Sequence, residues 1–94
     1  MEELLKLAEA GDTDAMYQLG RAYQFAKFDD APDYEKAFFW YSKAAQLRHI
    51  EAMTSVADAL SLGRGCKRDL EMAHVWYQEV YEIARSGKIG RAHV

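Results

Sequence analysis

The chain repeats itself once, and this repeat limits the folds open to it more than any other feature. The pair Ala-Met at residue 15 recurs at residue 52, a spacing of 37 residues. The segment DYEKAFFWY, which begins at Asp33, recurs as DLEMAHVWY from Asp69, at a spacing of 36. The extra residue of the first copy falls between Gln24 and Asp33, where a loop can absorb it. Such a period is typical of arrays in which each repeat is one supersecondary unit packed on its neighbours.

Each copy has the pattern of two helices joined by a loop. Apolar or small side chains recur at i, i+3 and i+4 from residue 15 onward, which indicates an amphipathic helix. Asp12 or Thr13 can act as its N-cap, and Asp33 can cap the next helix. Pro32 ends the first loop, and the glycines of LGRGCKRD turn the second. We therefore expect helices over about residues 13–25, 33–46, 51–62 and 69–85.

Equivalent positions of the two copies carry side chains of matching size. Ala37 recurs as Ala73, which suits a close approach between two helices. Trp40 recurs as Trp76, and both are followed by tyrosine. We expect the two tryptophans to be largely buried at equivalent positions, where they fill the gap between helix pairs.

The opening segment fits the second helix of an earlier repeat. Ala8 lies 37 residues before Ala45, and the outer positions of residues 2–10 are polar. A helix with a polar outer face suits the end of a repeat array. We therefore predict an all-α chain of five helices, with the boundaries 1–11 for a capping helix, 12–48 for the first repeat, 49–87 for the second and 88–94 for a tail.

Composition excludes several classes of protein. The 94 residues carry a net charge of −3, whereas a nucleic-acid binder usually shows a basic stripe. Cys66 is the single cysteine, so no intramolecular disulfide can form, and a reducing compartment is compatible with it. No stretch approaches the ~20 apolar residues of a membrane span. We expect a soluble, cytoplasmic protein without nucleic-acid or membrane partners.

The repeat resembles a known family. The sequence AMYQLGRAY, followed by a loop and DYEKAFFWYSKAA, is similar to the pattern of the Sel-one-like repeat family, a branch of the tetratricopeptide superfamily. In the second copy Val56, Ala57 and Leu60 replace the usual leucine, glycine and tyrosine, and Arg48 stands at a usual glycine between repeats. The resemblance implies a tetratricopeptide-like α-solenoid, with antiparallel helix pairs in a right-handed superhelix, and a bacterial-type cytoplasm.

The last seven residues, KIGRAHV, break the repeat pattern abruptly. They match the translation of a common sequencing-library adapter, including the stop codon that follows it. We therefore interpret them as non-native, and we expect the native chain to continue past about residue 87 into further repeats.

The sequence offers no constellation for catalysis. The serines lack a nucleophile-elbow context, and no His, Cys and Asp residues have metal-ligand spacing. His49 lies at the turn between repeats, where a structural role is expected, and Cys66 replaces a small loop residue. We predict that the chain is not an enzyme and holds no metal or cofactor.

A binding surface is the remaining candidate for a functional site. The resemblance implies that the first helix of each pair lines a concave face. Tyr17, Arg21 and Phe25 share one side of a helix because they are spaced i, i+4 and i+8. None of them matches a packing position of the repeat, so we expect Tyr17→Ala or Arg21→Ala to change stability little. The residues implied on this face are Asp14, Tyr17, Arg21, Gln24, Phe25, Glu51, Thr54, Asp58, Ser61 and Leu62.

Three functions stay open from sequence. We expect first a protein-interaction scaffold or adaptor whose partner has basic and apolar groups, since Glu51 and Asp58 make the second half of the face acidic. The alternative is an immunity-type inhibitor that neutralises a cognate toxin. The third is self-association through exposed repeat ends. Binding on the convex face, through Glu35, Phe39 and Lys43, is the competing placement of the surface.

Overall fold

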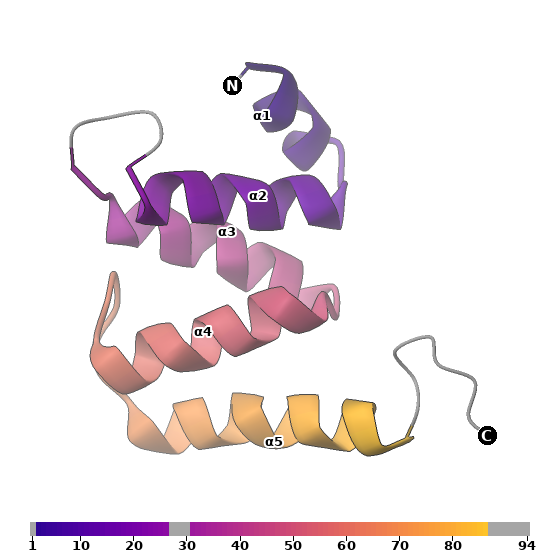
Figure 1. The fold of residues 1–94 in the computed structure, drawn as a ribbon, viewed down its shortest axis with the longest axis vertical. Coiled ribbons are helices and arrows are strands. Elements are labelled where there is room, and N and C mark those ends of the chain that lie inside the picture. The colour runs from indigo at the N-terminus through magenta and orange to yellow at the C-terminus, as the bar shows by residue number, and fades with distance from the viewer. Residues whose placement is uncertain (1, 27–30, 87–94) are drawn as a thin grey trace.

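A computed structural model describes residues 2–26 and 31–86 of the chain. Within these residues five helices follow one another, and consecutive helices pack side by side (Figure 1). Within the described residues there is no strand. The predicted all-α repeat solenoid is confirmed, and the last four helices agree with their expected ranges to within one residue. The helices are α1 (Glu2–Glu9), α2 (Thr13–Gln24), α3 (Tyr34–Gln46), α4 (Ile50–Leu62) and α5 (Leu70–Ser86).

Aspartate side chains cap the N-terminal ends of three of the helices. The Oδ1 atom of Asp12 accepts a hydrogen bond from the backbone N–H of Ala15 at 3.1 Å, so Asp12 rather than Thr13 is the N-cap of α2. Asp33 and Asp69 accept in the same way from the N–H groups three residues ahead, at 3.1 and 3.0 Å. Each bond satisfies a backbone donor that has no partner within its helix.

The loop between α4 and α5 depends on two glycines. Gly63 ends α4 in the left-handed conformation, with φ of 71°. Gly65 has φ of 76° and lies against the backbone of Tyr34, where an added Cβ would collide with the carbonyl oxygen. This loop is therefore seated on the start of α3, and the expectation that glycines turn the chain here is confirmed.

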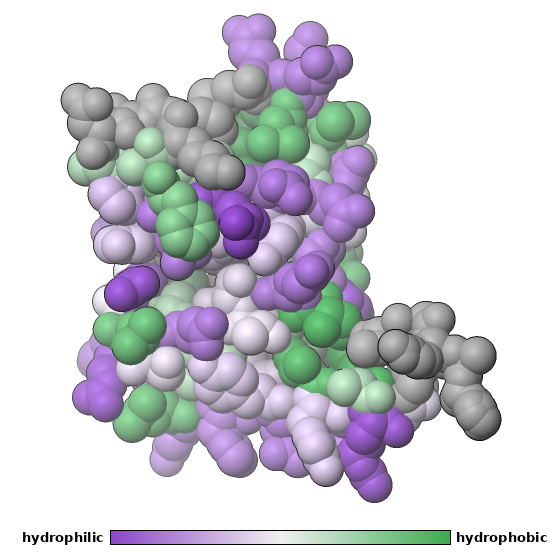
Figure 2. Space-filling view, in the orientation of Figure 1, coloured by the Kyte–Doolittle hydropathy of each residue, from purple (hydrophilic) through white to green (hydrophobic). Residues whose placement is uncertain are grey.

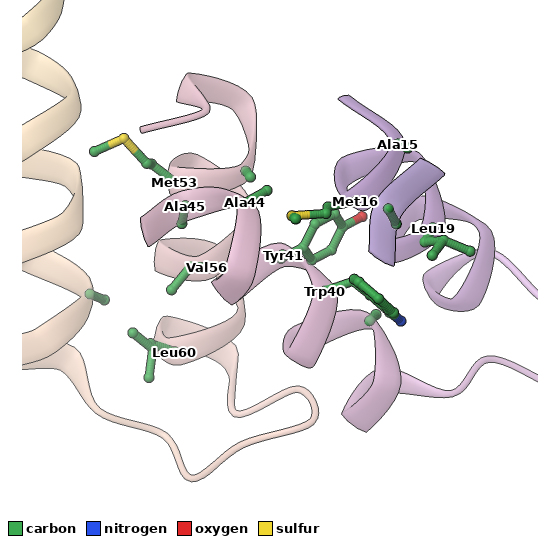
Figure 3. Close-up of a cluster of buried hydrophobic side chains, with 14 residues drawn as sticks. Ala15, Met16, Leu19, Trp40, Tyr41, Ala44, Ala45, Met53, Val56 and Leu60 are labelled. Atoms are coloured by element: carbon green, nitrogen blue, oxygen red, sulfur yellow. The ribbon is translucent and has the colours of Figure 1, made fainter. Parts of the chain in front are cut away.

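The core is continuous from α1 to α5 and is built largely from alanine. Leu19, Met53 and Val56 are its largest fully buried side chains. Ala44 and Ala45 of α3 are completely buried, which allows α4 to approach α3 closely. Figure 3 shows this cluster, with the larger side chains of α3 directed toward α2.

The two tryptophans differ in burial, so the expectation that both are largely buried is wrong for Trp76. Trp40 is 8% exposed, whereas Trp76 is only partly buried. The reason is position in the array: α3 packs between α2 and α4, whereas α5 makes extensive contacts with α4 alone among the described helices. Tyr81 is 60% exposed for the same reason, whereas the equivalent Ala45 is completely buried.

Candidate functional site

The first helices of the two pairs, α2 and α4, form one face of the molecule. Figure 1 shows them running in the same direction, with the antiparallel α3 between and behind them. Nine of the ten residues expected on the concave face lie within α2 or α4, and Phe25 is the C-cap of α2. The view in Figure 2 shows polar and apolar side chains interspersed over the surface rather than separated into large areas.

Arg21 connects two aromatic rings on α2. Its guanidinium carbon lies 5.9 Å from the ring centroid of Tyr17 and 5.2 Å from that of Phe25. Both distances are within the range of a cation–π interaction. Phe25 is 54% exposed, so this side of α2 presents an apolar ring to solvent. We call Tyr17, Arg21 and Phe25 the Arg21 patch.

Tyr17 belongs to the core as well as to the Arg21 patch. Its ring stacks on His49 with centroids 4.8 Å apart and lies 5.7 Å from the ring of Tyr41. These contacts bring together α2, α3 and the turn before α4. The structure therefore argues against the expectation that stability is indifferent to Tyr17, since its removal would uncover both neighbouring rings.

His49 connects the two repeats, and this explains the position of Asp14. The Nδ1 atom of His49 accepts from the backbone N–H of Ala52 at 3.2 Å, which makes His49 the N-cap of α4. Its Nε2 atom lies 2.8 Å from Oδ1 of Asp14 on α2. The neutral tautomer with hydrogen on Nε2 satisfies both contacts. The structural role expected for His49 is thereby confirmed.

The hydroxyl groups on α4 are occupied by their own helix. Thr54 donates to the carbonyl of Ile50 at 3.3 Å, and Ser61 donates to the carbonyl of Asp58 at 3.0 Å. The carboxylate of Asp58 accepts a hydrogen bond from the hydroxyl of Tyr77 on α5 and is otherwise exposed. The groups that α4 presents to solvent are therefore its carboxylates and Leu62, which is 59% exposed.

A cavity of about 50 Å³ lies between α2 and α4, with α3 as its floor. Gln24, Asp58 and Leu62, which were expected on this face, line it. The other lining residues were not predicted from sequence. Those on α3 follow helical spacing from residue 34, and this spacing could have indicated them. The missed residues are Tyr34, Ala37, Phe38, Tyr41, Ser55, Ala59 and Arg64.

The single cysteine, Cys66, is partly buried in the loop between α4 and α5. Its Sγ donates to the carbonyl oxygen of Ala59 at 3.5 Å, and burial raises the pKa of its thiol. A raised pKa favours the protonated thiol over the nucleophilic thiolate. Within residues 2–26 and 31–86, no group of three or more His, Cys, Asp or Glu side chains could hold a metal ion.

Comparison with known proteins identifies the repeat. The family model described as Sel1 repeat matches residues 13–49 and 50–80, which together make up well over half of the chain. The chain belongs to the Sel1 repeat family. The Sel1-repeat-containing protein YbeQ of Escherichia coli (strain K12) is 42% identical to it over 45 residues, which are 48% of this chain and 14% of YbeQ. Members of this family generally use the repeat as a non-catalytic scaffold for protein–protein interaction.

The described helices carry no segment suited to a bilayer. None of them combines the length and the apolar character needed to cross a membrane.

Proposed function

We propose that this Sel1 repeat chain is a scaffold or adaptor module that binds a protein partner on the face formed by α2 and α4. The observation that carries the proposal is the Arg21 patch. Its guanidinium is flanked by Tyr17 and Phe25, so an arginine and two aromatic rings form one surface. Arginine and tyrosine are enriched among the residues that dominate binding energy. An arginine already positioned by its neighbours also loses less side-chain entropy on binding.

The charges beside the Arg21 patch indicate the chemistry of the partner. Glu51 and Asp58 are exposed on α4, and Leu62 adds apolar area at the end of the same helix. A partner segment with basic and apolar side chains would complement this half of the face. Complementary charge acts mainly on the association rate and on the choice of partner.

A matched pair on the opposite side of the molecule allows a controlled test. Lys43 lies over the ring of Phe39, with Nζ 5.4 Å from the centroid, so α3 carries a second cation beside an exposed phenylalanine. Arg21→Ala and Phe25→Ala should each weaken binding of an isolated partner by ~1 kcal/mol or more. Lys43→Ala and Phe39→Ala should leave the affinity unchanged. The reverse result would place the partner on the convex face.

A further inference from the structure

The small cavity between α2 and α4 limits what can bind there by its size. Its volume is about 50 Å³. Pockets that hold cofactors or small-molecule ligands are usually roughly 300–1,000 Å³. The cavity therefore has space for the end of one side chain, and a bound partner segment is the natural source of one.

The hydroxyl groups around the cavity can accept hydrogen bonds better than they can donate them. The hydroxyl of Tyr41 donates to Oε1 of Gln24 at 2.6 Å, and that of Ser55 donates to the carbonyl of Glu51 at 3.0 Å. The hydroxyl of Tyr77 donates to the Asp58 carboxylate. These hydroxyl hydrogens are already used within the protein. The oxygens of Gln24, Ser55 and Asp58 keep lone pairs that an incoming donor can use.

Charge and apolar surface define the occupant further. Asp58 contributes a carboxylate to one side of the cavity, whereas the guanidinium of Arg64 lies 5.4 Å from the ring centroid of Tyr34. An anionic side chain would be repelled by Asp58, and a cation is best placed at the Asp58 side, away from Arg64. Phe38 and Leu62 supply apolar surface for an aliphatic stem.

We propose that this cavity takes the end of a lysine side chain from the bound partner, an assignment that rests on the proposed function of the α2–α4 face. The ammonium group donates to Asp58, Gln24 and Ser55, and its methylene groups lie on Phe38 and Leu62. An ammonium is compact and carries three donors, whereas guanidinium is a wide planar group that needs more space.

The direct test uses the complete chain and a small probe. Titration of the ¹⁵N-labelled protein with Nα-acetyl-lysine methylamide should shift the amide resonances of Gln24, Ser55 and Ala59. The norleucine analogue has the same stem without the charge, and it should bind about tenfold more weakly because a hydrogen bond to a charged group is lost. Equal binding of the two probes, tighter binding of the arginine analogue, or shifts confined to other residues would overturn the assignment.

Two substitutions, one at the cavity and one outside it, separate the cavity from its surroundings. Asp58→Asn keeps an oxygen for Tyr77 but removes the charge, so it should reduce lysine binding about tenfold. Glu71→Gln removes an exposed charge on α5, outside the cavity and away from the proposed binding face, and should have no such effect. Unchanged lysine binding in the Asp58→Asn variant would contradict the assignment. The amide spectrum of each free variant should match that of the parent, which checks that the variant is folded.

The outcomes also distinguish this inference from the proposed function. If the lysine probe fails while Arg21→Ala and Phe25→Ala still weaken the partner, the α2–α4 face binds and only the lysine assignment is wrong. If those two variants bind the partner normally, the proposed function is wrong. The assignment of a partner lysine to the cavity then fails as well, even where the free lysine probe binds.

Discussion

The ring of Tyr41 occupies the space that a side chain at residue 20 would need. A Cβ atom added to Gly20 would lie 2.5 Å from Cδ1 and 2.6 Å from Cε1 of Tyr41. This absence of a side chain lets α3 place a tyrosine, 3% exposed, directly against α2. In the second repeat Ala57 stands in place of Gly20, and the equivalent Tyr77 is 40% exposed with its hydroxyl bonded to Asp58.

Gly20→Ala should therefore destabilise the protein, although the same change inside a helix normally stabilises it. Overpacking costs about 1–3 kcal/mol, while alanine gains about 1 kcal/mol in helix propensity. We expect the free energy of unfolding, measured by urea denaturation, to fall by about 1 kcal/mol. In a Tyr41→Leu background the loss should shrink or reverse, because the colliding ring is gone. If Gly20→Ala instead stabilises the parent protein, the ring of Tyr41 moves aside at no cost in free energy.

The two tryptophans should differ in what their removal costs. Trp40→Ala should lower the free energy of unfolding by about 3–5 kcal/mol, since it empties a buried site in the core. Trp76→Ala should cost about 1–2 kcal/mol, because part of its ring already lies in water. Urea denaturation of both variants measures the difference. Equal losses would mean that Trp76 is covered as fully as Trp40 in solution.

Tyr41 should make stability fall at alkaline pH. Desolvation by burial, with a smaller contribution from Tyr17, raises the pKa of Tyr41 from 10.0 to about 12. The folded state thus binds this proton more tightly than the unfolded state. The resulting stability is fully present below pH 10.0 and is lost as pH rises toward 12.

Urea midpoints of the parent and of Tyr41→Phe, followed across this range, measure the effect. The stability of the parent should fall more steeply with pH than that of the variant. Ultraviolet titration should show a tyrosine that ionises near pH 12 in the parent, and this tyrosine should be missing from the variant. Parallel pH profiles would indicate that Tyr41 ionises alike in both states.

Helix positions were predictable from sequence because the signals for them are local. Asp12 and Asp33 each cap a helix through a backbone N–H three residues ahead. A few consecutive residues are therefore enough to predict where these helices begin. The small and aromatic positions recur at 36 or 37 residues and set the register of the packing. The spacing of Arg21 and Phe25 likewise predicted that they share one side of α2.

The burial of Tyr17 and the shape of the cavity could not be predicted from sequence, because both depend on segments that the fold brings together. Tyr17 is half-buried because His49 and Tyr41 arrive from the next turn and from α3. The cavity takes its lining from three helices and the loop that contains Arg64. Its depth depends on how far α2 and α4 separate above α3, and no local pattern encodes that distance.

The backbone of Arg48, in the turn between the repeats, has a conformation that favours glycine. Its φ is 70°, in the left-handed region, where a Cβ atom costs about 1–2 kcal/mol. Its side chain forms an ion pair with Glu79 at 2.9 Å, with both partners about half exposed, and a pair of this kind contributes about 0–1 kcal/mol. Glycine also gains backbone entropy in the unfolded state, which offsets part of the relief.

In a Glu79→Gln background the ion pair is already absent, so Arg48→Gly should raise the free energy of unfolding by about 0.5–1 kcal/mol. Gln46→Gly is the matched control two residues earlier. It lies in the last turn of α3 with helical geometry and should lose up to about 1 kcal/mol through lower helix propensity. If both glycines destabilise alike in urea denaturation, the turn between the repeats does not hold residue 48 in the left-handed region in solution, and the family's usual glycine would bring no benefit here.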